Sequence, residues 1–327
     1  MRDFLRSSVA RVWVPVLAAA AGMASLDRGT DPGDLVYFVH RGEQLLSGGW
    51  ASTFADPMLQ SGPLQLVLFG AVRNLSALAF VLELGTAALL LLVLGRLGVG
   101  DGLRLAAGLA AVGAGLTQLA FADGHPAEAV VPLLWVLAAV WARDDRVVAA
   151  GLLIGVSAGL ELWGVLGAPV LLLTPRLRRA ALGAAVEGVV VLAQLAPFAL
   201  AGRMRMFEHE WRVTSGTLLG LVVAPGTHFG WPLRLLQASL AMGAGAVVAT
   251  TMRRSLHAVW LVPLTVVVLR VLLDPVSFGW YWLAAEALAL VGAVLVLTEL
   301  PSRFPAARLG PAAGTRRRAA APPPVRS

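Results

Sequence analysis

Long apolar runs separated by short polar turns make up most of the chain. Ten runs are 12 to 22 residues long, and they occupy residues 9–26, 75–94, 105–121, 129–142, 147–160, 162–173, 180–201, 232–251, 257–273 and 281–298. A helix of about 20 apolar residues crosses a bilayer, whereas a membrane β-barrel shows short segments of alternating polarity. The pattern therefore predicts an all-α bundle of about ten membrane-spanning helices.

One pair of runs allows two interpretations. Residues 147–173 are almost uninterrupted apolar sequence, which is long enough for a single tilted helix. Two short crossings instead return the arginine-rich turn 176–179 to the side that holds the other arginine-rich turns. We therefore expect two short segments.

The composition excludes a soluble globular domain. Of the 327 residues, 58% are hydrophobic and 14% are charged, whereas a soluble domain contains roughly 25% charged residues. The chain has no cysteine, which excludes disulfides, thiolate metal ligands and thiol catalysis.

The net charge of +7 comes from the C-terminal tail. Residues 303–326 contain six arginines and no acidic residue, and the other 20 arginines nearly balance the 19 acids. A segment this rich in alanine, proline and arginine cannot bury a core. We expect residues 303–327 to form a disordered tail that contacts anionic lipid, and residues 1–302 to form the membrane domain. Nucleic acid is not an expected partner.

The distribution of arginine predicts the orientation. The first apolar run follows Arg2, Arg6 and Arg11, which places the N-terminus in the cytoplasm by the positive-inside rule. Small residues at the end of this run leave a cleaved signal peptide as the alternative. Alternation of ten spans puts 18 of the 26 arginines on one side, together with both termini. We expect a multi-pass protein of the plasma membrane with both termini cytoplasmic.

Two non-cytoplasmic loops, 27–62 and 202–231, are long enough to carry function. In the first loop, Asp34, Tyr37, Arg41 and Gln44 recur every three or four residues, opposite apolar positions. This spacing predicts a short amphipathic helix at the membrane surface, ending at the small residues 47–49. Residues 64–72 predict a second interfacial or re-entrant helix. Asp34 then has two interpretations: a functional carboxylate at the lipid boundary, or a residue that accepts amide hydrogen bonds in the first turn.

Several short motifs in this order resemble the GT-C membrane glycosyltransferases, most closely the actinobacterial polyprenol-phosphate-mannose-dependent group, family 87. The motifs are 34–37 (Asp-Leu-Val-Tyr), 44–48 (Gln-Leu-Leu-Ser-Gly), 56–64 (Asp-Pro-Met-Leu-Gln-Ser-Gly-Pro-Leu), 124–125 (Gly-His), 150–155, 162–169, 229–237 and 274–282. The likeness covers most of the chain, although each motif is short and degenerate.

The resemblance implies transfer of a sugar, mannose by analogy, from a polyprenyl phosphate to a lipid-linked or cell-envelope glycan. It also implies an acidic base in the first loop, and Asp34 is the position that matches. Such a carboxylate takes the proton of the acceptor hydroxyl as the anomeric carbon is attacked, with inversion. Asp31 and Asp27 are the reserve candidates for this base. The alternative role of Asp31 is a helix N-cap, and that of Asp27 is a solvated position at the end of a span.

A polyprenyl phosphate leaving group needs fixed cations, and guanidinium groups bind phosphate oxygens in bidentate fashion. Arg234 is the first candidate because it lies just inside a predicted span, and its alternative is snorkelling to the interface. Arg203, Arg205 and Arg270 follow. For Arg203 and Arg205 the alternative is solvation of a loop, and for Arg270 it is an ion pair with Asp274.

The expected substrate contacts are polar residues near these two groups: Tyr37, His40, Arg41, His125 and Gln237. For the two histidines, the alternative is ordinary polar surface. His209 stands between Glu208 and Glu210, but no metal-ligand spacing is present, so we expect neither metal nor cofactor.

Four carboxylates fall inside predicted spans, where a charge is costly unless it faces a cavity or a partner. They are Glu83, Glu161, Glu187 and Glu286. A transporter or flippase uses such groups in coupling, and this is the competing class. Glu161 also departs from the family pattern, in which a basic residue is expected before the tryptophan. A catalytically inactive GT-C relative is therefore a further alternative.

Overall fold

The computed structural model describes residues 7–26, 33–118 and 124–303, and these are mostly helical. The N-terminal half contains η1 (Val9–Trp13), α2 (Val14–Leu26), α3 (Leu35–Leu45), η2 (Trp50–Ala55), α4 (Pro63–Val72), α5 (Leu75–Arg96), α6 (Asp101–Gly113), α8 (Ala127–Arg143) and α9 (Val147–Leu160). The C-terminal half contains η3 (Leu162–Leu173), α10 (Leu177–Leu200), β1 (Trp211–Arg212), η4 (Leu219–Leu221), β2 (His228–Phe229), α11 (Trp231–Thr251), α12 (Ala258–Leu272), η5 (Gly279–Trp282) and α13 (Leu283–Arg303).

The predicted all-α class is confirmed. Within the described ranges, five helical segments are long and apolar enough to cross a membrane: Val9–Leu26, Leu75–Arg96, Leu177–Leu200, Trp231–Thr251 and Gly279–Glu299. Four more apolar helices are shorter: Pro63–Val72, Val147–Leu160, Leu162–Leu173 and Ala258–Leu272. By length and composition, the structure therefore offers five spanning helices where the apolar runs alone predict ten.

Two breaks in the chain explain part of this difference. The run 105–121 is not one helix, because α6 ends at Gly113 and Gly115 takes a positive φ of 75°. The run 147–173 divides at Glu161, which is extended between α9 and η3. The expected division into two short segments is confirmed, but the second is a 3-10 helix rather than an α-helix.

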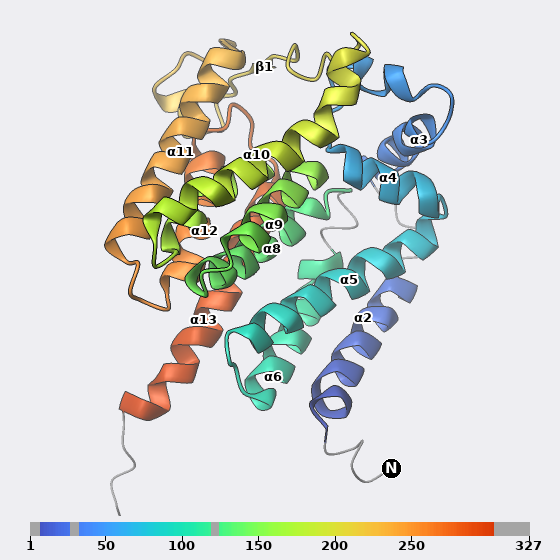
Figure 1. The fold of residues 1–327 in the computed structure, drawn as a ribbon. Helices are drawn as coiled ribbons and strands as arrows, with labels where there is room; N and C mark the ends of the chain where they lie inside the picture. The colour runs from blue at the N-terminus through green and yellow to red at the C-terminus, as the bar shows by residue number, and fades with distance from the viewer. Residues whose placement is uncertain (1–6, 27–32, 119–123, 304–327) are drawn as a thin grey trace, which may run out of the picture.

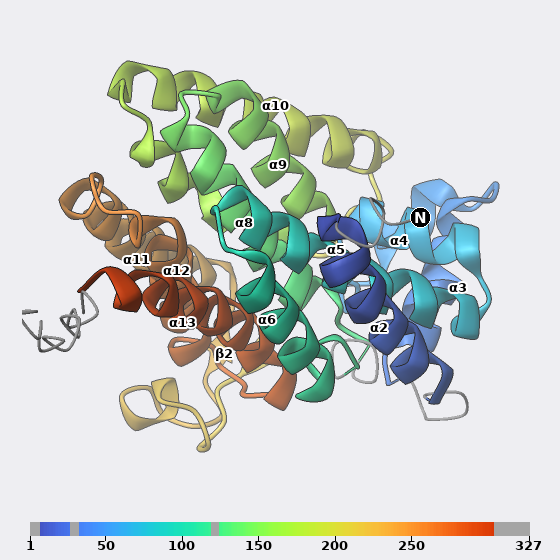
Figure 2. The same ribbon diagram turned by 90° about the horizontal axis from the view of Figure 1, so that it is seen from below.

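Helix α8 lies in the middle of the bundle and packs against α5, α9, α12 and α13 (Figure 2). Its Trp135 is fully buried and donates from Nε1 to Ser157 Oγ at 3.1 Å and to the carbonyl of Gly164 at 3.0 Å. One indole thereby joins α8, α9 and η3, which places the break at Glu161 against the central helix.

Small residues on α9 allow α10 to approach closely. Gly151, Gly155 and Gly159 recur every fourth residue, and a Cβ on Gly151 would lie 2.2 Å from the carbonyl oxygen of Gly183. Membrane helices commonly pack through such stripes, because dispersion contacts replace the hydrophobic driving force. The contact fixes α10 along the whole of α9.

The first long loop is built from two crossed helices. The predicted amphipathic helix is confirmed as α3, and the second predicted helix is confirmed as α4. They touch through their main chains, since a Cβ on Gly42 would lie 2.3 Å from the carbonyl oxygen of Leu66. The N–H of Gly62, just before α4, donates to the carbonyl of Leu160 at 2.9 Å. This bond attaches the loop to the break between α9 and η3.

The described chain has two distinct ends. Figure 1 shows the start of α2 and the end of α13 at the lower end, with α3 and β1 at the upper end. The upper end also includes the second long loop, in which β1 pairs antiparallel with β2. Both long loops therefore meet at one end of the bundle.

Candidate functional site

Asp34 contacts a second candidate residue, His125. Asp34 Oδ2 lies 3.2 Å from His125 Nε2, although the two residues are 91 positions apart. Asp34 is the N-cap residue of α3, but its side chain is 61% exposed and accepts no amide hydrogen bond in the first turn, contrary to the second interpretation. The reserves Asp31 and Asp27 lie outside the described residues.

Aromatic rings fix the imidazole of His125. It stacks on the indole of Trp280 with ring centroids 4.9 Å apart and planes at 6°, and Phe38 meets its edge. A carboxylate open to solvent beside an oriented imidazole has the chemistry of a general base. The motif at Gly124 and His125 and the first loop thus contribute residues to the same site.

The other polar residues of α3 face the loop instead of Asp34. Tyr37 Oη donates to Asp56 Oδ2 at 3.0 Å, and Arg41 forms an ion pair with the same oxygen. Arg41 also donates to Gln44 Oε1 at 3.0 Å, and Gln44 Nε2 donates to Ser52 Oγ at 3.2 Å. The expected shared face is thus divided: the structure uses Tyr37 and Arg41 to hold the loop together.

Asp56 is the centre of this loop network. Asp56 forms a local turn, with the N–H of Met58 donating to its Oδ1 at 3.0 Å. Burial alone would raise the pKa of Asp56, but the Met58 N–H, the Tyr37 hydroxyl and the Arg41 guanidinium together hold that pKa below its usual value. His40, by contrast, is 72% exposed and lies 3.5 Å from Glu43 on the same helix.

Arg234 lies in a half-buried polar cluster in the first turn of α11. Its Nη1 is 3.5 Å from Gln60 Oε1, and its Nη2 is 3.5 Å from the carbonyl of His209. Three buried atoms here make no hydrogen bond among the described residues: Arg234 Nε, Gln60 Nε2 and His209 Nε2. Buried polar atoms are nearly always paired, so these three atoms are available to water or to a polar ligand.

The cluster combines one cation with two neutral hydrogen-bonding groups. Burial and the nearby Arg234 guanidinium both lower the pKa of His209, so its imidazole is neutral at pH 7. Arg234 is then the cation of the cluster, with Gln60 and His209 as neutral hydrogen-bonding partners. Such an arrangement suits one phosphate group.

Arg270 is occupied by a carboxylate of the central helix. Its Nη1 and Nη2 each lie 3.2 Å from an oxygen of Glu128, and both side chains are buried. The guanidinium also lies over the rings of Trp163, at 4.3 Å, and Tyr281, at 5.1 Å. The alternative pairing of Arg270 with Asp274 is therefore wrong, because Glu128 forms the ion pair with Arg270 instead.

Asp274 is held by other groups. Its Oδ2 accepts from Gln237 Nε2 at 3.4 Å, and its Oδ1 accepts from the N–H of Val276 at 3.3 Å. Gln237 also donates to the carbonyl of Arg270 at 2.7 Å. Burial raises the pKa of Asp274, and the nearby guanidinium of Arg270 only partly offsets this effect. Gln237 thus bridges α12 and the following loop.

Glu161 lies where the first loop meets the bundle. Its Oε1 is 3.4 Å from Gln65 Nε2, and its main chain forms an isolated antiparallel bridge with Ser61. Glu128 and Arg270 are close enough to interact with it electrostatically. The residue that departs from the family pattern is therefore part of the charged region at this end.

The two loop arginines differ from Arg234. Arg205 pairs with Glu208 at 2.7 Å, and both side chains are more than half exposed. Arg203 is exposed, and the structure gives it no hydrogen bond or ion pair among the described residues. Of the four expected phosphate ligands, Arg234 alone combines burial with an unbonded donor atom in this part of the chain.

The carboxylates within apolar helices have different surroundings. Glu83 and Glu187 are buried, whereas Glu286 is exposed on the first turn of α13. Among the described residues, no group of three or more His, Asp or Glu side chains lies close enough to hold a metal ion.

Sequence reasoning misses three residues of this region. Glu128 stands three positions after His125 and directly before the apolar run 129–142, so a search for acids that border such runs would have found it. Gln60 and Asp56 lie within a quoted motif, but their partners are distant in the sequence. Only the fold brings Gln60 to Arg234.

Comparison of the chain with protein-family models, curated proteins and solved structures gives no match. The geometry of the site and the resemblance of its motifs therefore carry the functional argument.

Proposed function

We propose that this protein is an integral membrane glycosyltransferase that moves a sugar from a polyprenyl phosphate to a lipid-linked or cell-envelope glycan. The observation that carries the proposal is the unbonded buried cluster of Gln60, His209 and Arg234 at the end of the bundle that also holds the Asp34–His125 pair. A phosphate-linked donor and a hydroxyl acceptor require these two kinds of group. Mannose as the sugar rests on the family resemblance.

The chemistry assigns one task to each group. The acceptor oxygen attacks the anomeric carbon, the bond from that carbon to the phosphate oxygen breaks, and the acceptor proton passes to Asp34. His125 orients the carboxylate. Arg234 binds the phosphate that leaves with the polyprenyl chain, where a guanidinium in a half-buried site stabilises the developing charge.

The proposed membrane arrangement assigns a position to each of the apolar helices. The GT-C-like bundle crosses about ten times, with the shorter helices α9, η3 and α12 as crossings and with α3 and α4 at the interface. Both termini lie in the cytoplasm, and the site faces the other side of the plasma membrane. The basic tail contacts anionic lipid.

A transporter or flippase is the second candidate. The buried positions of Glu83 and Glu187 on apolar helices favour it, because a carboxylate in such a place suits ion coupling. The two classes predict opposite phenotypes, since a transporter needs these two residues and tolerates loss of Asp34.

The test is transfer of label from radioactive polyprenyl-phosphate mannose to a membrane glycan extract by the purified protein in lipid. We expect Asp34→Asn to lower the rate by about 100-fold or more, the usual size of general-base catalysis. Glu43→Gln is the matched control, because Glu43 is a half-exposed carboxylate on the same helix. Arg234→Gln should also lose activity, whereas Arg205→Gln should not.

Full activity of Asp34→Asn would remove the catalytic assignment. Absence of transfer from the mannose donor, together with vesicle uptake that depends on Glu83 or Glu187, would favour a transporter over an enzyme.

A further inference from the structure

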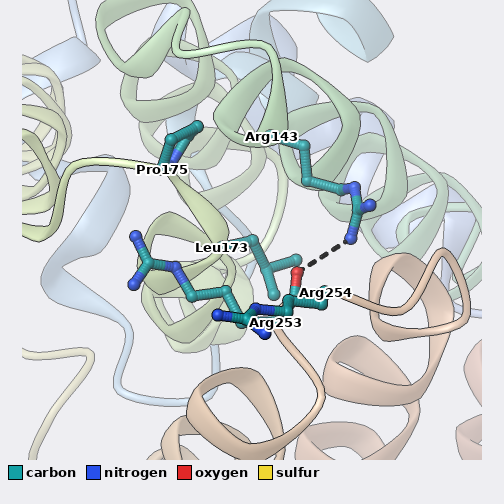
Figure 3. A pocket seen from close by; sticks show the side chains of 5 residues that line it. All are labelled: Arg143, Leu173, Pro175, Arg253 and Arg254. Carbon is teal, nitrogen blue, oxygen red and sulfur yellow. Dashed lines mark hydrogen bonds between the residues drawn. The ribbon is translucent and has the colours of Figure 1, made fainter.

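A second polar site lies at the opposite end of the bundle from Asp34. A pocket of about 370 Å³ is lined by Arg143, Leu173, Pro175, Arg253 and Arg254 (Figure 3). These residues come from the end of α8, the connection between η3 and α10, and the turn between α11 and α12.

The length of α8 separates this pocket from the candidate active site. The helix begins at Ala127, two residues after His125, and ends at Arg143. At 1.5 Å per residue, the two ends are roughly 24 Å apart. The pocket therefore cannot share a ligand with Asp34.

Main-chain carbonyls hold two of the arginines in place. Arg143 Nη1 donates to the carbonyls of Arg253, at 3.1 Å, and Ser255, at 2.5 Å, and Figure 3 shows the first of these bonds. Arg253 donates from Nε to the carbonyl of Thr174 at 2.9 Å, and from Nη2 to the same oxygen. Each guanidinium has five N–H groups, so both keep donors that these bonds do not use.

Arg254 differs from its neighbours. It is exposed, and the structure gives it no hydrogen bond or ion pair among the described residues. A structural role explains Arg143 and Arg253, which tie the turn to the bundle, but it does not explain a third arginine on the same pocket.

None of the five described residues that line the pocket is acidic. The nearby carboxylate of Asp145 is occupied by Arg179 and by Thr174 Oγ1 at 3.0 Å. Three like charges on one pocket repel one another, and an anion bound between them would offset this repulsion.

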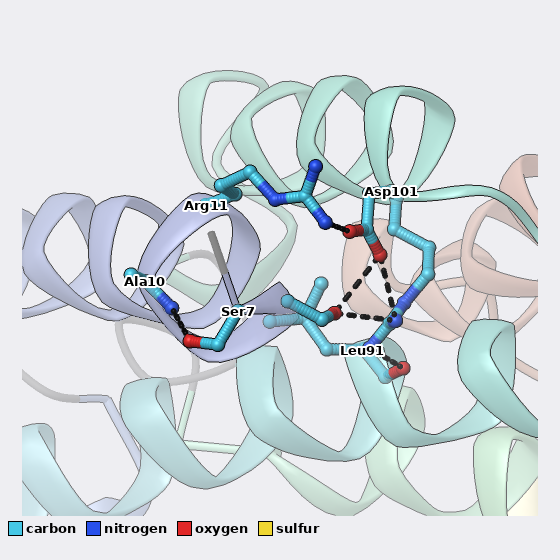
Figure 4. Close-up of polar contacts among 7 residues, drawn as sticks. Ser7, Ala10, Arg11, Leu91 and Asp101 are labelled. Atoms are coloured by element: carbon cyan, nitrogen blue, oxygen red, sulfur yellow. Dashed lines mark hydrogen bonds and ion pairs between the residues drawn. The ribbon is translucent and has the colours of Figure 1, made fainter. Parts of the chain in front are cut away.

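A basic cluster elsewhere at this end shows the contrasting arrangement. Asp101 pairs with Arg11 at 2.8 Å and with Arg104 at 3.4 Å, and Ser8 also donates to it (Figure 4). That cluster carries its own carboxylate between the cations, whereas the pocket at Arg254 does not.

We propose that the pocket formed by Arg143, Arg253 and Arg254 binds the phosphate group of an anionic membrane lipid. Guanidinium groups match phosphate oxygens in bidentate fashion, and Leu173 and Pro175 supply an apolar wall for the carbon chain beside the phosphate. Basic pockets between membrane helices are typical sites for such headgroups. The proposal does not rest on the proposed transfer reaction.

The test compares lipid binding by full-length variants. Protein in dodecylmaltoside is titrated with phosphatidylglycerol or phosphatidylcholine, and bound lipid is counted by native mass spectrometry. Arg254→Gln is the test variant, and Arg178→Gln is the control because Arg178 is exposed at the start of α10 but does not line the pocket. All variants keep residues 303–327, so any lipid bound by the tail contributes equally to each measurement.

We expect Arg254→Gln to weaken phosphatidylglycerol binding about tenfold, the effect of losing one charge-assisted hydrogen bond. Arg178→Gln and the phosphatidylcholine titration should show no such change. Equal losses in the two variants, or none in Arg254→Gln, would overturn the proposal. Displacement of bound lipid by millimolar inorganic phosphate, without preference for phosphatidylglycerol, would overturn the lipid assignment and identify a soluble phosphate site.

Discussion

Replacement of Glu128 by glutamine tests whether the ion pair with Arg270 holds the central helix to α12. Glutamine keeps the shape and one hydrogen-bond acceptor but removes the negative charge. Arg270 then remains a cation among the rings of Trp163 and Tyr281. The consequence is an uncompensated charge in a buried place.

The expected cost follows from the burial of the pair. The side chains of Glu128 and Arg270 are only 4% and 11% exposed. Loss of one partner of a buried ion pair destabilises a protein by about 3–5 kcal/mol. Asp274 also interacts electrostatically with Arg270 and reduces this cost. We therefore expect Glu128→Gln to lower the free energy of unfolding by about 2–3 kcal/mol.

The chain contains a matched control for this prediction. Arg205 and Glu208 form a shorter ion pair, at 2.7 Å, but their side chains are 55% and 54% exposed. Exposed pairs contribute about 0–1 kcal/mol, because water screens both charges. Glu208→Gln should therefore change the unfolding free energy by less than about 1 kcal/mol.

The assay is unfolding by SDS in dodecylmaltoside micelles at pH 7, followed by tryptophan fluorescence. A double variant, Glu128→Leu with Arg270→Met, should recover most of the loss, since it leaves no unpaired charge. Equal effects of Glu128→Gln and Glu208→Gln would refute the reasoning, because burial would then not decide the strength of the pair.

Two further predictions concern the first loop. Gly42→Ala should destabilise the protein by about 1–3 kcal/mol, since its Cβ would meet the main chain of α4. Gly85→Ala is the control: its added Cβ would have no neighbouring atom within 4 Å, so it should stabilise the protein by about 0.5–1 kcal/mol in the same assay. Asp56 has a lowered pKa, so its contribution is present above the unfolded value of 3.8 and is lost as the pH falls through the folded value. Limited proteolysis of residues 33–62 should increase below about pH 4 in the native protein. The Asp56→Asn variant should be cleaved readily at pH 7 and show little pH dependence. Equal cleavage of both proteins at pH 7 would contradict this assignment.

The local features of the fold are predictable from the sequence. The apolar runs give the helical class, and the spacing of polar residues in 34–44 gives α3, because both signals depend on neighbours within one or two turns. The small residues at 47–49 and the Gly62-Pro63 pair mark the ends of loop segments for the same reason.

The site is less predictable because its partners are distant. Arg270 and Glu128 are 142 positions apart, and no local pattern favours Glu128 over Asp274 as the partner of Arg270. In η3, Gly164 packs against α9 and Gly167 packs against Trp135 of α8, and these contacts are also distant in the sequence. Periodicity alone predicts an ordinary apolar α-helix for that run.

The main-chain contacts between glycines limit how this protein can change by mutation. At Gly62, an added methyl group would meet the carbonyl of Gly159 at 2.1 Å, so no side chain exists on the partner that a second mutation could shorten. At Gly292, the obstacle is the indole of Trp260, which a smaller residue can replace. In a pairwise mutational scan, substitutions at Gly62 should therefore have no second-site suppressor at position 159, whereas substitutions at Gly292 should be rescued at position 260.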